Sequence, residues 1–379
     1  MTQQTFSVRL SGFLRKKLDE LKAEQGENSP AYLGLARQYL GSEQEQKAFD
    51  EQGIKHYEAG VTTSETEGLP GIERLYRRAL VIETTLACAA HCRYCLRQNY
   101  PPHTLTEEQL LDVAQYCGSP QNRDDLTEVL ITGGDPMLIP HRLETLLNAL
   151  IEHAPNIRTV SLATRLFGHD PGRVDEHLLN IFRNKPSLRF EVATQINHPV
   201  EFFPEMIDAL RKVQDVGAKI YSQNVLLKHI NDDFGTLVEL YDRMRQNHVE
   251  AHYLFHPVPL LSTHHFRNSL DRGLELARQL TSCGAISGRA KPMFAVMTDI
   301  GKITLYEGSI IKREGRQVLF QSGYRLEDRL AWNPSWQMPE TAEVDDGGFL
   351  RVWYLDGEED QAGGEVVPPR ETRLRGRRS

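Results

Sequence analysis

The stretch ALVIETTLACAAHCRYCLRQ, residues 79–98, joins a short apolar run to the three cysteines Cys88, Cys92 and Cys95. ALVIETT (79–85) is rich in apolar and β-branched residues, which predicts a buried strand. The cysteines follow immediately, so they are expected at the carboxyl end of that strand. In barrels of parallel strands this is the end that carries the chemistry. The stretch therefore predicts both the first strand of an α/β sheet and the place of a site.

Five further runs of the same kind follow along the chain, over residues 128–134, 157–164, 188–194, 218–227 and 250–258. Helical patterns separate them, as in HRLETLLNALIEH (141–153) and DFGTLVELYDRMRQ (233–246). Strands that alternate with helices predict βα units and a parallel sheet. Right-handed crossovers then close these units into a partial barrel. The expected fold is an α/β partial (β/α)6 barrel that resembles a TIM barrel.

The barrel pattern occupies only the middle of the 379 residues. Residues 1–70 are polar with a helical pattern and predict a helical cover, which ends at the turn-forming EGLPGIE (67–73). The barrel is expected over 71–284. Residues 285–365 are β-rich and predict a carboxyl-terminal extension, and the basic tail 366–379 is expected to be a flexible, solvated end.

Composition limits the class of protein. A hydrophobic content of 40% and a charged content of 25% are ordinary for a globular protein. The net charge of -8 argues against a nucleic-acid or membrane-surface partner. The chain has no apolar run of about 18 residues and no apolar core of a secretory signal near its start. Five cysteines, three of them clustered, do not form a disulfide framework, so we expect a cytoplasmic protein.

The spacing Cys88-x3-Cys92-x2-Cys95 gives an odd number of thiols. Three thiolates can bind three irons of a cubane [4Fe–4S] cluster and leave the fourth iron open. Zinc is an alternative that needs a fourth ligand, which His91 inside the loop could supply. Three buried structural thiols are the other alternative. The open cluster is favoured because the loop is short, polar and directly follows a strand.

With Tyr94 before its last cysteine, this loop resembles the signature of radical S-adenosylmethionine (SAM) enzymes. In that superfamily the open iron binds SAM, and electron transfer cleaves SAM to methionine and a 5′-deoxyadenosyl radical. The segment TGGDPML (132–138) resembles the strand end that receives the methionine amino group. The resemblance implies that Gly133, Gly134 and Asp135 bind SAM, and that a flavodoxin- or ferredoxin-type protein is the reductant.

Over roughly residues 70–325 the chain resembles the lysine 2,3-aminomutase family in particular. The similar segments are CRYCLRQ (92–98), LITGGDPML (130–138), ATRL (163–166), NHPVE (197–201), SQNVLLKHIND (222–232) and HFRNSLDRG (265–273). The resemblance implies a small-molecule α-amino acid substrate whose amino group moves from Cα to Cβ. It also assigns Arg97 to the substrate carboxylate, a role that suits a planar guanidinium. Gln223 and His198 match positions that line the SAM site, and Arg165 follows the third strand as a further cofactor-binding candidate.

The family carries pyridoxal phosphate on a lysine near the end of the barrel, and Lys302 in TDIGKITL (298–305) occupies that position. The glycine run before this lysine is shortened here to Ile300-Gly301, and an exposed lysine in a turn is the alternative. Arg78, just before the first strand, is placed like the arginine that binds the cofactor phosphate. Arg74 and Arg77 compete for that role.

The chain departs from the family where lysine-specific members bind the substrate ammonium with two aspartates. Those positions hold His256 and Met297 here, and Asp299 lies two residues beyond the second. A buried cation without its two acids is strongly disfavoured, so we expect a substrate other than lysine. Arg289, Lys291 and His256 would complement an acidic or neutral polar side chain, such as that of glutamate, glutamine or aspartate.

The cysteine cluster that binds a zinc between subunits in the family is missing. Cys117 and Cys283 lie in helical patterns and are expected in the core, so any homo-oligomer would form without that zinc.

Two other functions remain open. One is a radical SAM enzyme with another outcome: dehydrogenation, decarboxylation, epimerisation, or aminomutation of a carrier-bound or peptide substrate. The other is a non-enzymatic iron–sulfur carrier or sensor, against which Gly-Gly-Asp and Gln223 argue.

Overall fold

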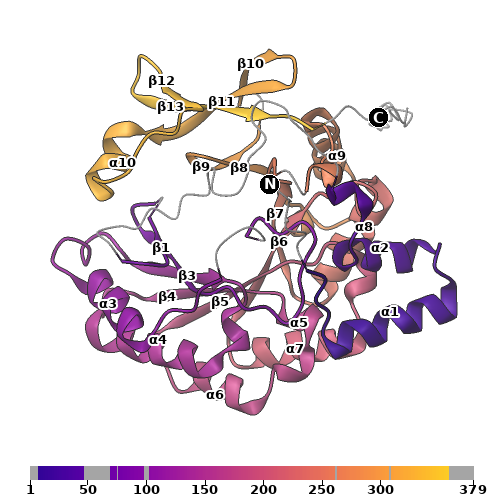
Figure 1. The fold of residues 1–379 in the computed structure, drawn as a ribbon, viewed down its shortest axis with the longest axis horizontal. Helices are drawn as coiled ribbons and strands as arrows, with labels where there is room; N and C mark the ends of the chain where they lie inside the picture. The colour runs from indigo at the N-terminus through magenta and orange to yellow at the C-terminus, as the bar shows by residue number, and fades with distance from the viewer. Residues whose placement is uncertain are drawn as a thin grey trace, which may run out of the picture.

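The computed structural model describes residues 7–46, 69–74, 76–97, 102–260, 263–306 and 309–357. The basic tail that the sequence predicts over 366–379 lies outside these residues. Figure 1 shows a curled sheet with helices along its outer side, two amino-terminal helices at one flank and a second, smaller sheet across the top. The expected α/β partial barrel is confirmed by this arrangement.

The larger sheet contains nine described strands, and hydrogen bonds join them in the order of the chain. They are β1 (Ile72–Glu73), β2 (Ala79–Thr85), β3 (Glu128–Gly133), β4 (Thr159–Thr164), β5 (Arg189–Thr194), β6 (Lys219–Val225), β7 (Glu250–His256), β8 (Met293–Thr298) and β9 (Gly301–Thr304). Strands β2 to β8 are parallel, while β1 and β9 are antiparallel at the two edges. The six predicted strands are β2 to β7. The sheet continues beyond residue 284, where the barrel was expected to end, because β8 pairs with β7.

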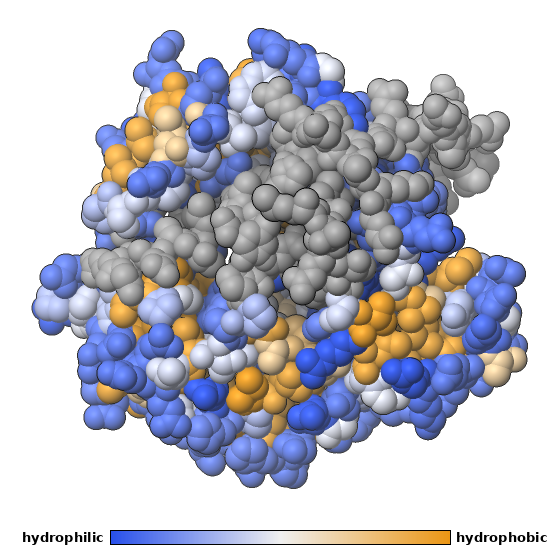
Figure 2. All heavy atoms as spheres, viewed as in Figure 1, coloured by the Kyte–Doolittle hydropathy of each residue, from blue (hydrophilic) through white to orange (hydrophobic). Residues whose placement is uncertain are grey.

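The helices that cross between these strands pack on one face of the sheet. They are α3 (Glu107–Gly118), α4 (Pro140–His153), α5 (Leu166–His169), α6 (Glu176–Arg183), α7 (Pro204–Asp215), α8 (Phe234–Gln246) and α9 (Leu270–Ser282). Leu80 and Ile82 of β2 are fully buried in the core that these helices share. Side chains alternate along a strand, so Val81 and Glu83 lie on the opposite, inner face. Figure 2 shows that the visible outer surface over the helices is mostly hydrophilic with scattered apolar patches.

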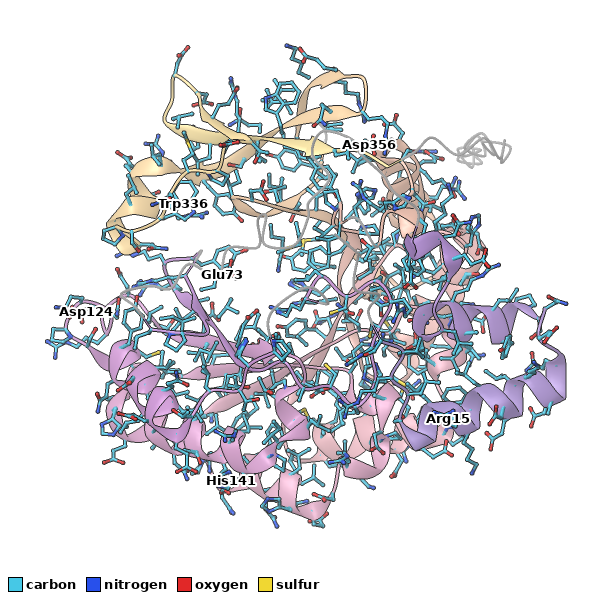
Figure 3. All side chains as sticks on the ribbon, in the orientation of Figure 1. Arg15, Glu73, Asp124, His141, Trp336 and Asp356 are labelled. Carbon is cyan, nitrogen blue, oxygen red and sulfur yellow. The ribbon has the colours of Figure 1, made fainter. Side chains whose placement is uncertain are left out.

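Both ends of the described chain pack against the barrel. Helices α1 (Gly12–Gln25) and α2 (Pro30–Tyr39) begin at the capping serines Ser11 and Ser29 and share a small core with Ala90 of the cysteine loop. The carboxyl-terminal sheet has the order β10 (Ile310–Glu314), β11 (Gln317–Arg325), β13 (Phe349–Leu355) and β12 (Ala342–Val344), with α10 (Leu326–Trp332) beside it. Figure 3 shows Glu73 on the barrel side and Trp336 on the side of this sheet. None of the helices in the described ranges is long and apolar enough to span a membrane.

Candidate active site

The cysteine loop leaves the end of β2, as the sequence predicts. Cys88, Cys92 and Cys95 are partly buried and form no disulfide. Within the described ranges no three His, Cys, Asp or Glu side chains converge on one metal ion. The three thiols leave one short loop, and His91 Nδ1 lies 3.0 Å from Ser7 O.

The glycines after β3 pack directly against the chain that leads into this loop. The amide of Gly134 donates to Thr85 O (2.5 Å), and that of Asp135 donates to Ala87 O (2.9 Å). Gly133 has a positive φ of 117°, and a Cβ there would lie 2.1 Å from Thr85 O. A Cβ on Gly134 would lie 2.3 Å from Ala87 O. Both positions need glycine because two backbones meet here.

The carboxylate of Asp135 joins the ends of two strands. It accepts hydrogen bonds from the Thr164 hydroxyl (2.8 Å), the Arg165 amide (3.0 Å) and the Met137 amide (3.1 Å). Burial raises its pKa to about 6, although these hydrogen bonds oppose the shift. In the described chain, Gly-Gly-Asp thus aligns β2, β3 and β4 at the carboxyl edge. Its proposed contact with SAM remains a prediction.

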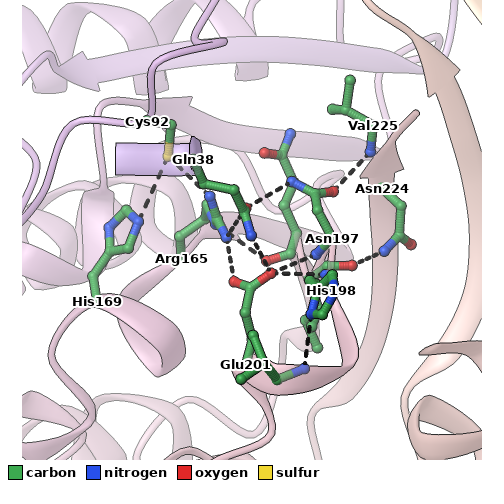
Figure 4. Close-up of polar contacts among 12 residues, drawn as sticks. Gln38, Cys92, Arg165, His169, Asn197, His198, Glu201, Asn224 and Val225 are labelled. Carbon is green, nitrogen blue, oxygen red and sulfur yellow. Dashed lines mark hydrogen bonds and ion pairs between the residues drawn. The ribbon is translucent and has the colours of Figure 1, made fainter. Parts of the chain in front are cut away.

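Arg165, at the end of β4, is the centre of a buried polar network around the cysteine loop (Figure 4). Its Nη1 lies 3.0 Å from Cys92 Sγ and also donates to the Tyr94 hydroxyl. Its Nη2 forms an ion pair with Glu201 Oε2 (2.5 Å) and donates to Gln38 Oε1 (3.3 Å). The structure therefore places this arginine against a cysteine of the loop.

His198 belongs to the outer part of the same network. Its Nδ1 accepts a hydrogen bond from the Val200 amide (3.2 Å), and its ring lies against Gly34 of α2, where a Cβ would come within 2.5 Å. Burial lowers its pKa. His198 is thus a capping residue in contact with α2, and its role at a SAM site stays a prediction.

Arg97 forms an ion pair with a glutamate on the inner face of the barrel. Its Nε lies 2.5 Å from Oε1 of Glu83, whose side chain is only 2% exposed. Glu73 on the neighbouring strand is also buried, and burial raises its pKa to about 8, with the Glu83 charge adding to the shift. Oε2 of Glu83 and Oε1 of Glu73 have no hydrogen-bond partner among the described residues. Sequence reasoning missed both acids because neither belongs to a motif: Glu83 is a lone glutamate in an apolar run, and Glu73 follows a turn.

Lys302 lies on β9, paired in register with Met297 of β8. Its Nζ is 4.2 Å from the centre of the Tyr253 ring and 5.3 Å from that of Phe255. Burial lowers its pKa to about 8. Gln223 of β6 pairs in register with Tyr253, so it lies on the strand beside the ring that contacts Lys302. The sequence-predicted residues Lys302, Met297 and Gln223 therefore belong to one side of the barrel.

Two side chains from the carboxyl-terminal region hold the backbone around Lys302. The Tyr324 hydroxyl donates to Lys302 O (2.5 Å), and Arg329 Nη2 donates to Ile300 O (2.7 Å). The Arg329 guanidinium carbon lies 5.2 Å from the Tyr324 ring centre and 5.0 Å from that of Trp336. Nε and Nη1 of this buried arginine have no hydrogen-bond partner among the described residues. Sequence reasoning missed Arg329, since an arginine in a short helix is usually exposed.

The side chains of three expected arginines contact the loop before β3. Arg78 is exposed and donates to the carbonyls of Asp124 (3.0 Å) and Asp125 (3.1 Å). Arg77 pairs with the Asp125 carboxylate, and Arg74 is buried against Asn122. All three therefore contact the loop that leads into β3, and none of these contacts involves Lys302.

His256 lies on the other face of β7 from Tyr253 and Phe255. It is fully buried, with Nδ1 at 2.7 Å from the Tyr354 hydroxyl and Nε2 at 2.7 Å from Asn268 O. Burial lowers its pKa to about 3. This placement differs from the expected contact with a substrate side chain, because both ring nitrogens already hold structural hydrogen bonds on the outer face.

The remaining expected substrate residues also have partners elsewhere. Asp299 is buried in the turn between β8 and β9 and accepts a hydrogen bond from the Thr341 hydroxyl (2.6 Å). Arg289 forms an exposed ion pair with Glu250 (3.2 Å), and Lys291 donates to Thr281 O (2.5 Å). Of the five residues expected near the substrate side chain, Met297 is the one that pairs in register with Lys302.

Comparisons with known proteins agree with this geometry. Residues 82–241 match the family model described as "Radical SAM superfamily". A protein of Aquifex aeolicus named "Putative L-lysine 2,3-aminomutase" is 30% identical over 263 residues, which cover 67% of this chain and 68% of the relative. The "Glutamate 2,3-aminomutase" of Clostridioides difficile is 28% identical, and the match covers 64% of this chain and 61% of that protein.

A solved structure of a radical SAM methyltransferase from Sphaerobacter thermophilus matches 60% of this chain and 69% of its own, with 17% identity and a TM-score of 0.45. We draw no argument from a likeness of this size. The family model and the sequence relatives, together with the cysteine loop after β2, show that the chain belongs to the radical SAM superfamily and, within it, to the lysine 2,3-aminomutase family.

Proposed function

We propose that this protein is a pyridoxal phosphate-dependent radical SAM 2,3-aminomutase acting on an α-amino acid with an acidic or neutral polar side chain. When bound, the [4Fe–4S] cluster and SAM supply a radical that removes a hydrogen from the substrate, and pyridoxal phosphate supplies the π-system for amino-group migration. A flavodoxin- or ferredoxin-type protein is the proposed electron donor. The following residues support each part of the proposal.

The environment of Lys302 carries the proposal. A lysine attacks a carbonyl group only as a neutral amine, and burial against aromatic rings is a known way to favour that form. The Lys302 amine lies over the Tyr253 ring with a pKa of about 8, so a substantial fraction is neutral near physiological pH. Tyr324 and Arg329 fix its backbone, which limits the positions that the amine can reach. These features fit a lysine that holds a carbonyl cofactor.

Arg329 is our candidate for the cofactor phosphate, in place of Arg78. Glu73 keeps its proton at neutral pH because of its raised pKa, and Glu83 is paired with Arg97. Arg97 thus has an ion pair with Glu83, whereas Arg329 forms no ion pair with a carboxylate within the described residues. Its Nε and Nη1, buried and without hydrogen bonds in the described chain, fit an anion close to Lys302.

Cys88, Cys92 and Cys95 fit the three thiolate ligands of a cluster with one open iron, since all three leave a single strand end and none is oxidised to a disulfide. Gly133, Gly134 and Asp135 form the adjoining edge, where SAM is proposed to bind with Gln223. Arg97 is the proposed partner of the substrate carboxylate, and its ion pair with Glu83 orients the guanidinium.

The substrate class is inferred from the side chains near Lys302. Met297, which occupies a position where lysine-specific relatives carry an acid, offers a thioether beside Lys302. An ammonium side chain placed there would lose water without gaining an opposite charge. The name of the glutamate 2,3-aminomutase relative is in keeping with a substrate other than lysine.

The decisive experiment traps the lysine and then identifies the product. Borohydride reduction of the protein with pyridoxal phosphate should place a pyridoxyl group on the peptide that contains Lys302. The same treatment should leave the exposed Lys312 unmodified at equal cofactor, and Lys302→Arg should lose the adduct whereas Lys312→Arg should not. Anaerobic incubation with SAM, reductant and amino acids should then yield a β-amino acid. A pyridoxyl group distributed over surface lysines, or a decarboxylated or dehydrogenated product, would refute the aminomutase assignment.

A further inference from the structure

The amino-terminal helices do more than cover the barrel, because they contact the cysteine loop directly. The amide of Arg93 donates to Gln38 O at the end of α2 (2.8 Å), and the amide of His91 donates to Arg9 O (3.0 Å). Arg93 also forms a buried ion pair with Glu45. Residues before the barrel thus fix the backbone between Cys88 and Cys95.

Cys92 receives two nitrogen contacts at its sulfur. Arg165 Nη1 lies 3.0 Å from Sγ, and His169 Nε2 lies 3.6 Å from it (Figure 4). The guanidinium is a donor only, whereas either ring nitrogen of the histidine can carry the proton. A neutral histidine with its proton on Nε2 donates to a thiolate sulfur. Both contacts therefore complement a negative charge on Cys92.

Gln38 of α2 holds the first of these donors. Its Oε1 accepts from Arg165 Nη2 (3.3 Å), while its Nε2 donates to Glu201 Oε1 (3.0 Å) and to Gly34 O (2.9 Å). Gln38 is fully buried. Glu201 also holds Arg165, through an ion pair with the same Nη2. The Arg165 guanidinium is thus held by Gln38 of α2 on one side and by Glu201, which follows β5, on the other.

The neighbouring Tyr39 of α2 contacts both donors. The Arg165 guanidinium carbon lies 5.4 Å from the Tyr39 ring centre, and the His169 ring packs edge-on at 5.5 Å. Tyr39 is fully buried as well. Two consecutive residues of one helix thus set the positions of the two groups that contact the Cys92 sulfur.

Donors and positive charge at a cluster thiolate stabilise the reduced cluster more than the oxidised one, because reduction adds a negative charge. The effect is large where water is excluded, since the effective dielectric constant is low. Arg165 is buried within this network, so little water screens its charge from the sulfur, while the ion pair with Glu201 offsets part of that charge.

We propose that Arg165 and His169, held in place by Gln38 and Tyr39 of α2, raise the reduction potential of the cluster through their contacts with Cys92. They are positioning residues for the electron-transfer step, and the amino-terminal helices form part of the redox site. The inference rests on the cluster that the superfamily implies. It is independent of pyridoxal phosphate and of the substrate.

The test is an anaerobic redox titration of the reconstituted full-length protein, followed by the electron paramagnetic resonance signal of the reduced cluster. No SAM, pyridoxal phosphate or amino acid is present, so failure of the aminomutase proposal cannot affect the result. We expect a more negative midpoint potential in His169→Phe, which removes the ring contact with Cys92, and a larger shift in Arg165→Gln, which removes a charged donor. Gln38→Met should shift the potential in the same direction by a smaller amount.

Matched controls use the same substitutions on the surface of α6. Arg183→Gln removes an exposed arginine that pairs with Glu176, and His177→Phe replaces an exposed histidine. Both should keep the parent potential. If Arg165→Gln fails to retain iron and sulfide, His169→Phe and Gln38→Met decide the matter. Unchanged potentials in these two variants, at full cluster content, would overturn the proposal, and a shift in His169→Phe without one in Gln38→Met would overturn the part assigned to α2.

Discussion

The side-chain nitrogen of Lys302 on β9 lies 4.2 Å from the centre of the Tyr253 ring on β7, with β8 between the two strands in the sheet. Burial in this place lowers the pKa of the lysine from its ordinary value of 10.5 to about 8. The position is unusual for a lysine, which keeps its charge in water in most proteins. It makes the amine reactive at a pH where exposed lysines are protonated.

The first prediction concerns the pH dependence of this amine. The neutral fraction of Lys302 should rise as pH increases through about 8 and then level off. The initial rate of pyridoxal phosphate attachment at Lys302, trapped with borohydride and measured by peptide mass spectrometry, should follow the same curve. Lys312 is exposed and provides the internal control. If both lysines show one common pH profile, the lowered pKa is refuted.

The second prediction concerns the protonated acid Glu73. Its pKa of about 8 in the folded state lies above the ordinary value of 4.5, so the folded protein binds this proton more tightly than the unfolded chain. Stability should therefore fall as pH rises from about 4.5 to about 8, and the loss should be complete above that range. Glu73→Gln should remove this component and raise the free energy of unfolding above about pH 8 by a few kcal/mol.

Urea denaturation at several pH values measures this effect. Glu343→Gln, which changes an exposed glutamate on β12, is the matched control and should leave the pH dependence of the parent protein unchanged. Parallel stability curves for Glu73→Gln and the parent would show that Glu73 is ionised in the fold.

The third prediction separates a structural histidine from a substrate-binding one. His256→Leu should lower the free energy of unfolding by about 2–4 kcal/mol, because it removes two buried hydrogen bonds, one to Asn268 O and one to the Tyr354 hydroxyl. Tyr354→Phe keeps the contact between His256 and Asn268 O but removes those of the hydroxyl with His256 and Pro257 O, and should cost about 1–2 kcal/mol. Denaturation with urea measures both values. A stable His256→Leu protein that consumes a different amino acid would assign the histidine to the substrate after all.

His256 also shows how far sequence reasoning reaches. The alternation of apolar runs and helical patterns located β2 to β7 closely, because hydrophobic burial sets that periodicity. The motifs likewise placed the cysteines, Gly133 and Arg165 at the carboxyl edge. Near the end of β7, however, neighbouring residues point to opposite faces of the sheet, so an error of one position assigns a side chain to the wrong face. Tyr253 therefore reaches Lys302 while His256 joins the outer core.

Local sequence patterns do not predict contacts between segments that are far apart in the chain. Arg329 donates to Ile300 O only because α10 folds back beside β9, and no spacing in the sequence indicates this. Gln38 lies in a stretch that reads as an ordinary amphipathic helix, although it contacts Arg165 from 127 residues away. Glu83 interrupts an apolar strand without a motif. Such residues become visible only when the packing brings their partners together.

The last prediction tests the close approach between the Gly-Gly-Asp turn and the cysteine loop. Gly134→Ala would place a methyl group 2.3 Å from Ala87 O, so one of the two backbones must move. Ala87 directly precedes Cys88, and the movement should displace that thiol from its place in the triad. We expect a reconstituted protein with less bound iron and sulfide, and stability lower by about 1–3 kcal/mol. Gly12→Ala is the control, since a Cβ there meets no atom within 4 Å. If Gly134→Ala binds as much iron as Gly12→Ala, the glycine is not required for the geometry of the loop, and its presence must be explained by direct contact with SAM.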